Sequence, residues 1–73
     1  MTNLLAAMIE THAVDVAALT VASRDLNVCR RMQAGMRGTG ALLNANRISR
    51  LELEVKFLLA SIDSRDAEID AVT

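Results

Sequence analysis

The sequence contains no proline, tryptophan or tyrosine, and it has one phenylalanine (Phe57), one cysteine (Cys29) and one histidine (His12). A single cysteine excludes an intramolecular disulfide framework, and one cysteine with one histidine cannot supply a four-ligand zinc site within one copy. The lack of aromatic side chains removes the stacking platforms on which single-stranded nucleic acids bind. A chain of 73 residues buries little surface by itself. Partner chains are therefore the expected source of additional stability.

Hydrophobic residues make up 52% of the chain, and eight basic residues nearly balance nine acidic residues. Disorder requires low hydrophobicity and high net charge, so this composition predicts a folded chain. The apolar segment 4–22 has Glu10, His12 and Asp15 in its middle, and each acid there would cost about 2.5–3.5 kcal/mol in a membrane. No positively charged region precedes this segment, which argues against a cleavable signal peptide. We therefore expect a cytoplasmic protein with no membrane partner.

All three glycines lie in segment 35–40, which divides the chain into two arms of similar length. Each arm is free of glycine and proline and is rich in residues with high helix propensity. Thr2 or Asn3 can cap the first arm, and Thr39 can cap the second. The sequence predicts one all-α domain over residues 1–73, an antiparallel hairpin with helices at about 3–34 and 41–72 around a loop at 35–40.

The second arm carries apolar side chains at alternating spacings of three and four residues, which is the pattern of a coiled-coil seam. Arg65 occupies one of these positions and is expected to interrupt the seam. We predict that the seam mediates self-association together with two side chains of the first arm. The predicted self-association residues are Val16, Leu19, Ile48, Leu51, Val55, Leu58, Ile62 and Ile69.

Each arm also has a second apolar side. In the second arm, Leu53 and Phe57 begin a stripe that continues in small residues on nearly the opposite side from the seam. A single hairpin covers only one side of each helix. We therefore predict a homo-oligomer, most simply a dimer that forms a four-helix bundle or a coiled-coil-like assembly. In the first arm we predict two faces. The first face consists of Leu5, Met8, Ile9, His12, Val16 and Leu19. The second face consists of Leu4, Ala7, Val14, Ala18, Val21, Val28 and Met32.

Positive charge concentrates around the loop. Residues 24–56 carry seven basic and three acidic side chains, whereas both flanking segments are acidic. Arginine clusters bind phosphates, but the overall acidic balance and the absence of a recognition motif make nucleic acid the less favoured partner. Two hairpins packed head to tail would place basic ends beside acidic ends. The candidate basic tip consists of Arg30, Arg31, Arg37, Arg47 and Arg50.

No constellation of residues predicts catalysis, a cofactor or a metal. His12 and Asp15 are three residues apart, but no nucleophile is near them in sequence, so a hydrogen-bonded interface histidine is the preferred interpretation. The helical phase of Cys29 favours a small buried hydrophobe over a reactive thiol. Segment 35–40 matches neither GxGxxG nor GxxxxGK[ST], so it predicts a turn and not a nucleotide loop.

The candidate partner surface combines Met32 and Met36, one turn apart beside the loop, with Leu53 and Phe57, because methionine repacks readily against different partners. In shape alone, the expected hairpin is similar to small dimeric regulators, inhibitors and co-chaperones. We expect a non-enzymatic protein–protein interaction module of that kind, acting through apolar helix faces. The alternatives are a structural subunit of a larger helical assembly or filament, and nucleic-acid binding through the arginine-rich loop end.

Overall fold

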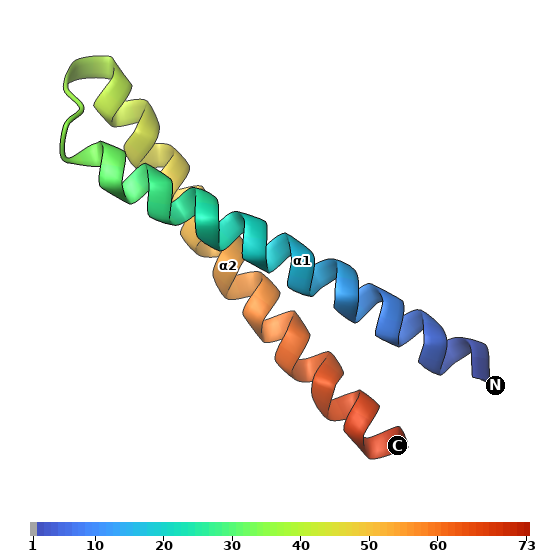
Figure 1. Cartoon of the computed structure of the whole chain (residues 1–73). Helices are drawn as coiled ribbons and strands as arrows, with labels where there is room; N and C mark the ends of the chain where they lie inside the picture. The colour runs from blue at the N-terminus through green and yellow to red at the C-terminus, as the bar shows by residue number, and fades with distance from the viewer. Residues whose placement is uncertain (1) are drawn as a thin grey trace.

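The computed structural model describes the backbone of residues 2–73 and the side chains of residues 3–73. It consists of two long helices, α1 (Thr2–Gln33) and α2 (Gly38–Val72), and no strand occurs among these residues. The helices run antiparallel, so both termini lie at one end of the molecule and the loop lies at the other (Figure 1). The prediction of an all-α helical hairpin is confirmed.

The connection between the helices is shorter than predicted, because α2 already begins at Gly38. Arg37 holds the N-cap position with an extended backbone and makes no side-chain cap hydrogen bond. The predicted cap by Thr39 is therefore wrong, since Thr39 lies within the first turn of α2. Asn3 lies inside α1, which begins at Thr2, and the side chain of Thr2 is outside the described residues.

Two backbone hydrogen bonds close the end of α1. The Gly35 amide donates to the Met32 carbonyl at 3.0 Å, and the Met36 amide donates to the Gln33 carbonyl at 3.2 Å. The chain then enters α2 through Gly38, whose φ of +67° is rarely adopted by residues that carry a Cβ. Glycine at this position therefore permits the reversal of the chain.

The seam predicted on the second arm faces α1 of the same chain. Its members are half-buried and the residues between them are mostly exposed, as the three–four spacing requires. A matching series on α1 shares Leu5, Met8, His12 and Leu19 with the first face predicted for that arm, and it includes three polar side chains. Ile9 and Val16, also predicted on that face, are exposed. The α2 seam consists of Ile48, Leu51, Val55, Leu58, Ile62, Arg65 and Ile69, and the α1 seam of Leu5, Met8, His12, Asp15, Leu19, Ala22, Leu26, Cys29 and Gln33.

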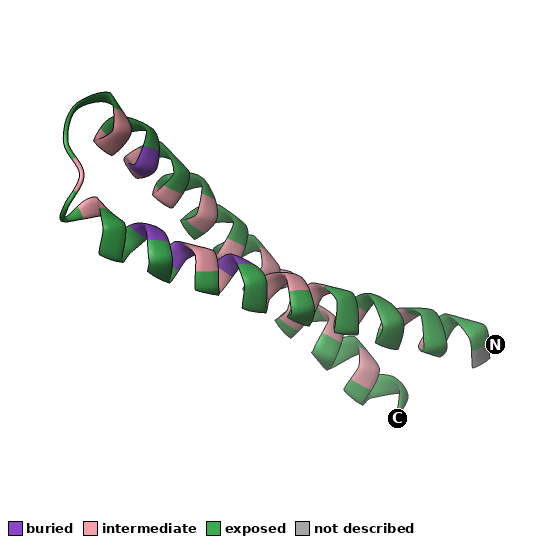
Figure 2. Ribbon diagram, turned by 45° about the horizontal axis from the view of Figure 1, so that its top comes forward, coloured by how far each residue is buried: buried purple, intermediate pink, exposed green. Residues whose placement is uncertain are grey.

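Little of the molecule is buried. The buried apolar side chains among the described residues are Ala22, Leu26 and Cys29, and Asn44 is the buried polar one. Figure 2 shows that these positions lie in the half of the hairpin nearest the loop. The molecule measures 55 × 14 × 14 Å, and its radius of gyration is 16.4 Å. A compact domain of this length would have a radius of gyration of about 11 Å, so the hairpin has a small core and a large surface.

Candidate functional site

A polar cluster joins the two helices next to the loop. The Asn44 side-chain amide donates to the Cys29 carbonyl at 2.9 Å and to Gln33 Oε1 at 2.7 Å. Gln33 Nε2 in turn donates to the Ala41 carbonyl at 3.3 Å. A shift of one helix along the other would leave the buried Asn44 amide without these acceptors, which is costly. The cluster therefore fixes the register of the hairpin.

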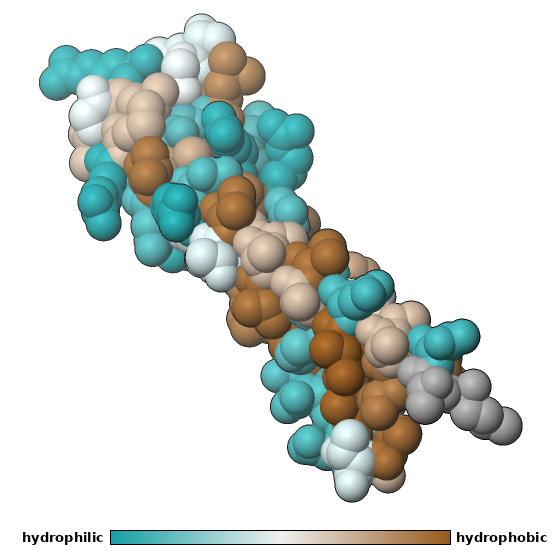
Figure 3. Space-filling model, turned by 45° about the vertical axis from the view of Figure 1, so that its right-hand side comes forward, coloured by the Kyte–Doolittle hydropathy of each residue, from teal (hydrophilic) through white to brown (hydrophobic). Residues whose placement is uncertain are grey.

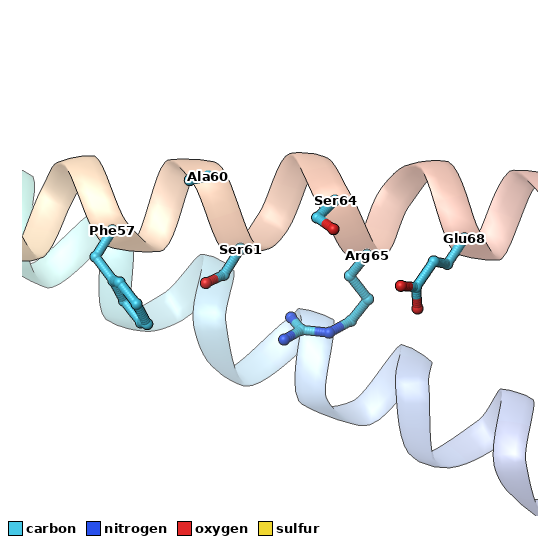
Figure 4. A pocket seen from close by; sticks show the side chains of 6 residues that line it. All are labelled: Phe57, Ala60, Ser61, Ser64, Arg65 and Glu68. Carbon is cyan, nitrogen blue, oxygen red and sulfur yellow. The ribbon is translucent and has the colours of Figure 1, made fainter.

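A second polar contact joins the helices nearer the termini. Arg65 Nη1 donates to Asp15 Oδ2 at 2.6 Å, and each side chain is only about a fifth exposed (21% and 22%). Figure 4 shows the Arg65 side chain extending from α2 toward α1. The predicted interruption of the seam at Arg65 is therefore wrong, because the ion pair continues the contact between the helices. The signal in the sequence was two opposite charges at seam positions of facing arms.

His12 lies on the α1 seam, one turn before Asp15, and is half-buried. Its Nδ1 is shielded from solvent and has no hydrogen-bond partner among the described residues. Its predicted position at an interface is confirmed, but the predicted hydrogen bond is not found at this nitrogen. Asp15 bonds to Arg65 and not to His12. Within residues 3–73, no group of three or more His, Cys, Asp or Glu side chains could hold a metal ion.

Cys29 is a free cysteine buried between the helices, and its exposed fraction is 5%. Its backbone carbonyl accepts the hydrogen bond from Asn44. The burial predicted for Cys29 is thus confirmed, and the side chain serves as a small apolar member of the core.

Large apolar side chains occupy much of the surface. Thirteen are exposed among the described residues, whereas three apolar side chains are buried. Figure 3 shows apolar side chains gathered along the half of the molecule nearest the termini, with many hydrophilic side chains toward the loop. The exposed set is Leu4, Ile9, Val14, Val16, Val21, Val28, Met32, Leu42, Leu43, Leu53, Phe57, Leu59 and Val72.

The exposed stripe on α2 lies on the side away from α1. Leu53 and Phe57 are 67% and 71% exposed, so these two predicted partner-surface residues are accessible. The stripe continues toward the C-terminus in exposed Ala60, Ser64 and Ala67. Beside Phe57 is a shallow recess formed by α2 alone (Figure 4), and its lining residues are Phe57, Ala60, Ser61, Ser64, Arg65 and Glu68.

The exposed apolar residues of α1 form a second three–four series beside its seam. We call Val14, Val21 and Val28, which recur every seven residues and are all exposed, the valine face. An open groove separates this face from α2. Its lining residues are Ala17, Ala18, Val21, Ala22, Asp25, Leu51 and Glu54.

The predicted self-association residues have two different surroundings. Those on α2, together with Leu19, are half-buried in the contact between the two helices of one chain, whereas Val16 is exposed. Self-association through these residues stays a prediction. The surface accessible to a second chain is provided by the other, exposed apolar side chains.

Met32 and Met36 do not form one exposed pair. Met32 is half exposed, whereas Met36, a residue of the loop itself, is partly buried. Its Cε lies 3.5 Å from the position that a Cβ on Gly40 would take. Met32 thus remains accessible to a partner, and Met36 packs within the hairpin.

The five arginines of the basic tip are all exposed around the loop end. Arg30 Nη2 lies 3.9 Å from Glu52 Oε2, and both side chains are about half exposed, so this pair adds little stability. The opposite end of the hairpin carries an acidic segment of α2. Its charged residues are Asp63, Asp66, Glu68 and Asp70, with Arg65. Charge is therefore separated along the 55 Å length of the molecule.

By length and composition, α1 could also span a membrane. An 18-residue window within Asn3–Gln33 has a mean hydropathy of 1.5, and none of that window is buried. A helix that packs against another protein chain can have the same properties. In one copy of the chain, large apolar side chains of α1 such as Val14, Val21 and Val28 are exposed.

Comparisons with protein-family models, with curated proteins and with solved structures found no match for this chain. The candidate surfaces among the described residues are the valine face of α1, the Leu53–Phe57 stripe of α2 and the basic tip.

Proposed function

We propose that this protein is a non-enzymatic interaction module, a small oligomeric regulator, inhibitor or co-chaperone that binds other protein chains through its exposed apolar helix faces. The observation that supports this function is the imbalance between thirteen exposed large apolar side chains and three buried apolar ones. Contiguous exposed apolar surface of this kind marks interaction sites.

The accessible surface supports the same proposal. It amounts to 5497 Å², compared with about 4,400 Å² expected for a compact protein of this mass. The difference, about 1,100 Å², is similar to the area of about 800 Å² that each partner contributes to a stable interface. One further helix–helix contact would bring the exposed surface close to that of an ordinary small protein.

The partner is expected to contribute a helix to the Leu53–Phe57 stripe. Leu53 and Phe57 would act as anchors for apolar side chains one turn apart on that helix. The small side chains that follow, Ala60, Ser64 and Ala67, would let the partner backbone approach α2 closely.

Affinity capture from the source cell tests this function. We expect the wild-type chain to retain a protein at fixed stoichiometry, measured by mass, and the Leu53→Glu/Phe57→Glu variant to lose it. Both residues are exposed, so the variant keeps its fold. Asn27→Glu, at an exposed position on α1, is the matched control and should retain the protein. Equal retention by all three chains would show that this stripe is not the binding surface.

The first alternative is a structural subunit of a larger helical assembly or filament. Apolar faces on different sides of one hairpin allow open-ended contacts, which is the specific observation in its favour. Light scattering across a range of concentrations distinguishes the two functions. A mass that increases without limit favours the structural subunit, and a fixed small mass favours the interaction module.

The second alternative is nucleic-acid binding through the basic tip, whose five arginines are all exposed. Phosphate contacts weaken steeply as salt increases. Titration with a fluorescent RNA or DNA at two salt concentrations tests this function, and no binding at low salt would exclude it.

A further inference from the structure

We propose that a second copy of this chain docks on the valine face of α1, with the two α1 helices antiparallel across a two-fold axis near Ala18. The inference rests on the proposed function, since it assigns self-association to one face and one orientation. It differs from the prediction made from the sequence, because the α2 seam residues are already in contact with α1 of their own chain.

The spacing of the valine face fits a helix as its occupant. Val14, Val21 and Val28 are one heptad apart, as in a coiled-coil seam. The groove beside them has a floor of small side chains at Ala17, Ala18 and Ala22. A helix can therefore approach α1 closely at the middle of the apolar series, which extends from Leu4 to Met32.

A second copy supplies a matching helix. In a two-fold dimer the same patch is used by both chains, so valines of one copy would pack against valines of the other. The whole hairpin also exposes about 1,100 Å² more surface than a compact protein of its mass, so an interface of about 800 Å² per chain would still leave the surface of an ordinary small protein.

The charges beside the valine face favour the antiparallel orientation. Parallel helices would place the two Asp25 carboxylates opposite each other across the axis, whereas an axis near Ala18 separates them by about 21 Å of helix. Glu10 of each copy would then lie about 3 Å along the axis from the level of Arg24 of the other copy, and Asp25 of that copy would lie between these two levels. Glu10 and Arg24 are both exposed and lie beside the face. The acidic end of each hairpin would also adjoin the basic tip of the other.

Insertion of α1 into a lipid bilayer is the alternative to docking of a second copy, and the charges of the hairpin disfavour that insertion. Asp15 is bonded to Arg65, so α2 would have to remain beside α1 in a membrane. The outer side of α2 carries Glu52, Lys56 and Asp63. Charged side chains within a bilayer are expensive, so a protein surface is the better cover for the valine face.

Cysteine cross-linking tests the docking. In a Cys29→Ala background, with Cys29→Val as a second background if the first unfolds, single cysteines are introduced by Ala18→Cys, Val28→Cys and Val16→Cys. We expect oxidation to link Ala18→Cys chains into a covalent dimer, because this position lies at the axis. Val28→Cys should fail to link to itself but should link to Ala7→Cys when the two chains are mixed. Val16→Cys, exposed outside the valine face, is the matched control and should stay monomeric on a denaturing gel.

Three results would overturn the inference. Self-linking of Val28→Cys as rapid as that of Ala18→Cys would show a parallel dimer. Preferential linking of Val16→Cys would show a different face. Flotation of the wild-type chain with phosphatidylcholine vesicles, without linking of Ala18→Cys, would show that lipid covers α1. An oligomer in solution with the wrong linking pattern would contradict only this docking, whereas a folded monomer that captures no protein would also contradict the proposed function.

Discussion

At the scale of single residues, the polar side chains of the seam determine how the two helices align. Leucine, isoleucine and valine would accept a shift by one heptad, since each would meet another apolar side chain. The bonds of Asn44 to Gln33 and of Arg65 to Asp15 are satisfied in one register only. The two pairs lie in different halves of the hairpin, so together they specify both the register and the antiparallel direction.

Replacement of Asn44 by alanine should lower the free energy of unfolding by about 1–3 kcal/mol, because the Cys29 carbonyl and Gln33 Oε1 lose a buried donor. Urea denaturation followed by circular dichroism measures this change. Asn46→Ala is the control, since Asn46 is exposed on the same helix, and it should change stability by less than about 0.5 kcal/mol. Equal effects of the two substitutions would contradict the role of the polar cluster.

The Asp15–Arg65 pair should behave as a partly buried ion pair. Asp15→Leu or Arg65→Leu alone should cost about 1–3 kcal/mol, less than a fully buried pair, because water still reaches both groups. The double variant Asp15→Leu/Arg65→Leu should be at least as stable as the wild type, since two apolar side chains then meet in the seam. A double-mutant cycle in urea measures the coupling, and additive losses would contradict it.

At the scale of the elements, the two helices, the turn and the α2 seam could be predicted, because the glycines lie together and Ile48, Leu51 and Val55 begin a regular apolar series. The exposure of Leu53 and Phe57 also followed from their phase. The α1 seam could be predicted only in part, at Leu5, Met8 and Leu19 with His12. An apolar criterion misses Asp15 and Gln33, which also belong to this seam. Their partners, Arg65 and Asn44, are distant in the sequence and come close only in the folded hairpin.

Two details of the loop, the residue at which α2 begins and the burial of Met36, also could not be predicted from the sequence pattern. The beginning of α2 at Gly38 depends on a positive φ that no capping rule indicates. The burial of Met36 depends on the path of the chain over Gly40. Both are consequences of joining two fixed helix ends by a short connection.

The glycines of the turn should differ in their tolerance of a side chain. Gly38→Ala should destabilise the hairpin by about 1 kcal/mol, because alanine at a φ of +67° is strained. Gly40→Ala is the matched control. Its Cβ would meet only Met36 Cε at an ordinary 3.5 Å, and it should stabilise α2 by about 0.5–1 kcal/mol through its higher helix propensity. Thermal denaturation measures both, and the opposite order would contradict the conformation of the turn.

Substitutions of two leucines of α2 distinguish the seam, which faces α1, from the outer side of the helix. Leu51→Asp should unfold the hairpin, because it places an unpaired charge in the contact with α1. Leu53→Asp, two residues away and 67% exposed, should retain the helical circular dichroism signal of the wild type. An unchanged melting temperature for Leu51→Asp would show that the seam is placed on the wrong face.

At the scale of the whole molecule, the hairpin is long and has few buried side chains. The buried side chains lie near the loop, the seam side chains in the half nearest the termini are only half-buried, and apolar side chains face outward on both helices. The loop end is basic and the terminal end is acidic. Shape, exposed apolar area and charge separation together support the proposal that the chain functions in contact with other chains.

Sedimentation equilibrium of the wild-type chain tests this central claim most directly. Burial of the exposed apolar side chains in a dimer predicts a folded species with twice the 7.9 kDa mass of the chain at micromolar concentrations, and a melting temperature that rises with concentration. A fully helical monomer over the whole concentration range, with a constant melting temperature, would contradict it.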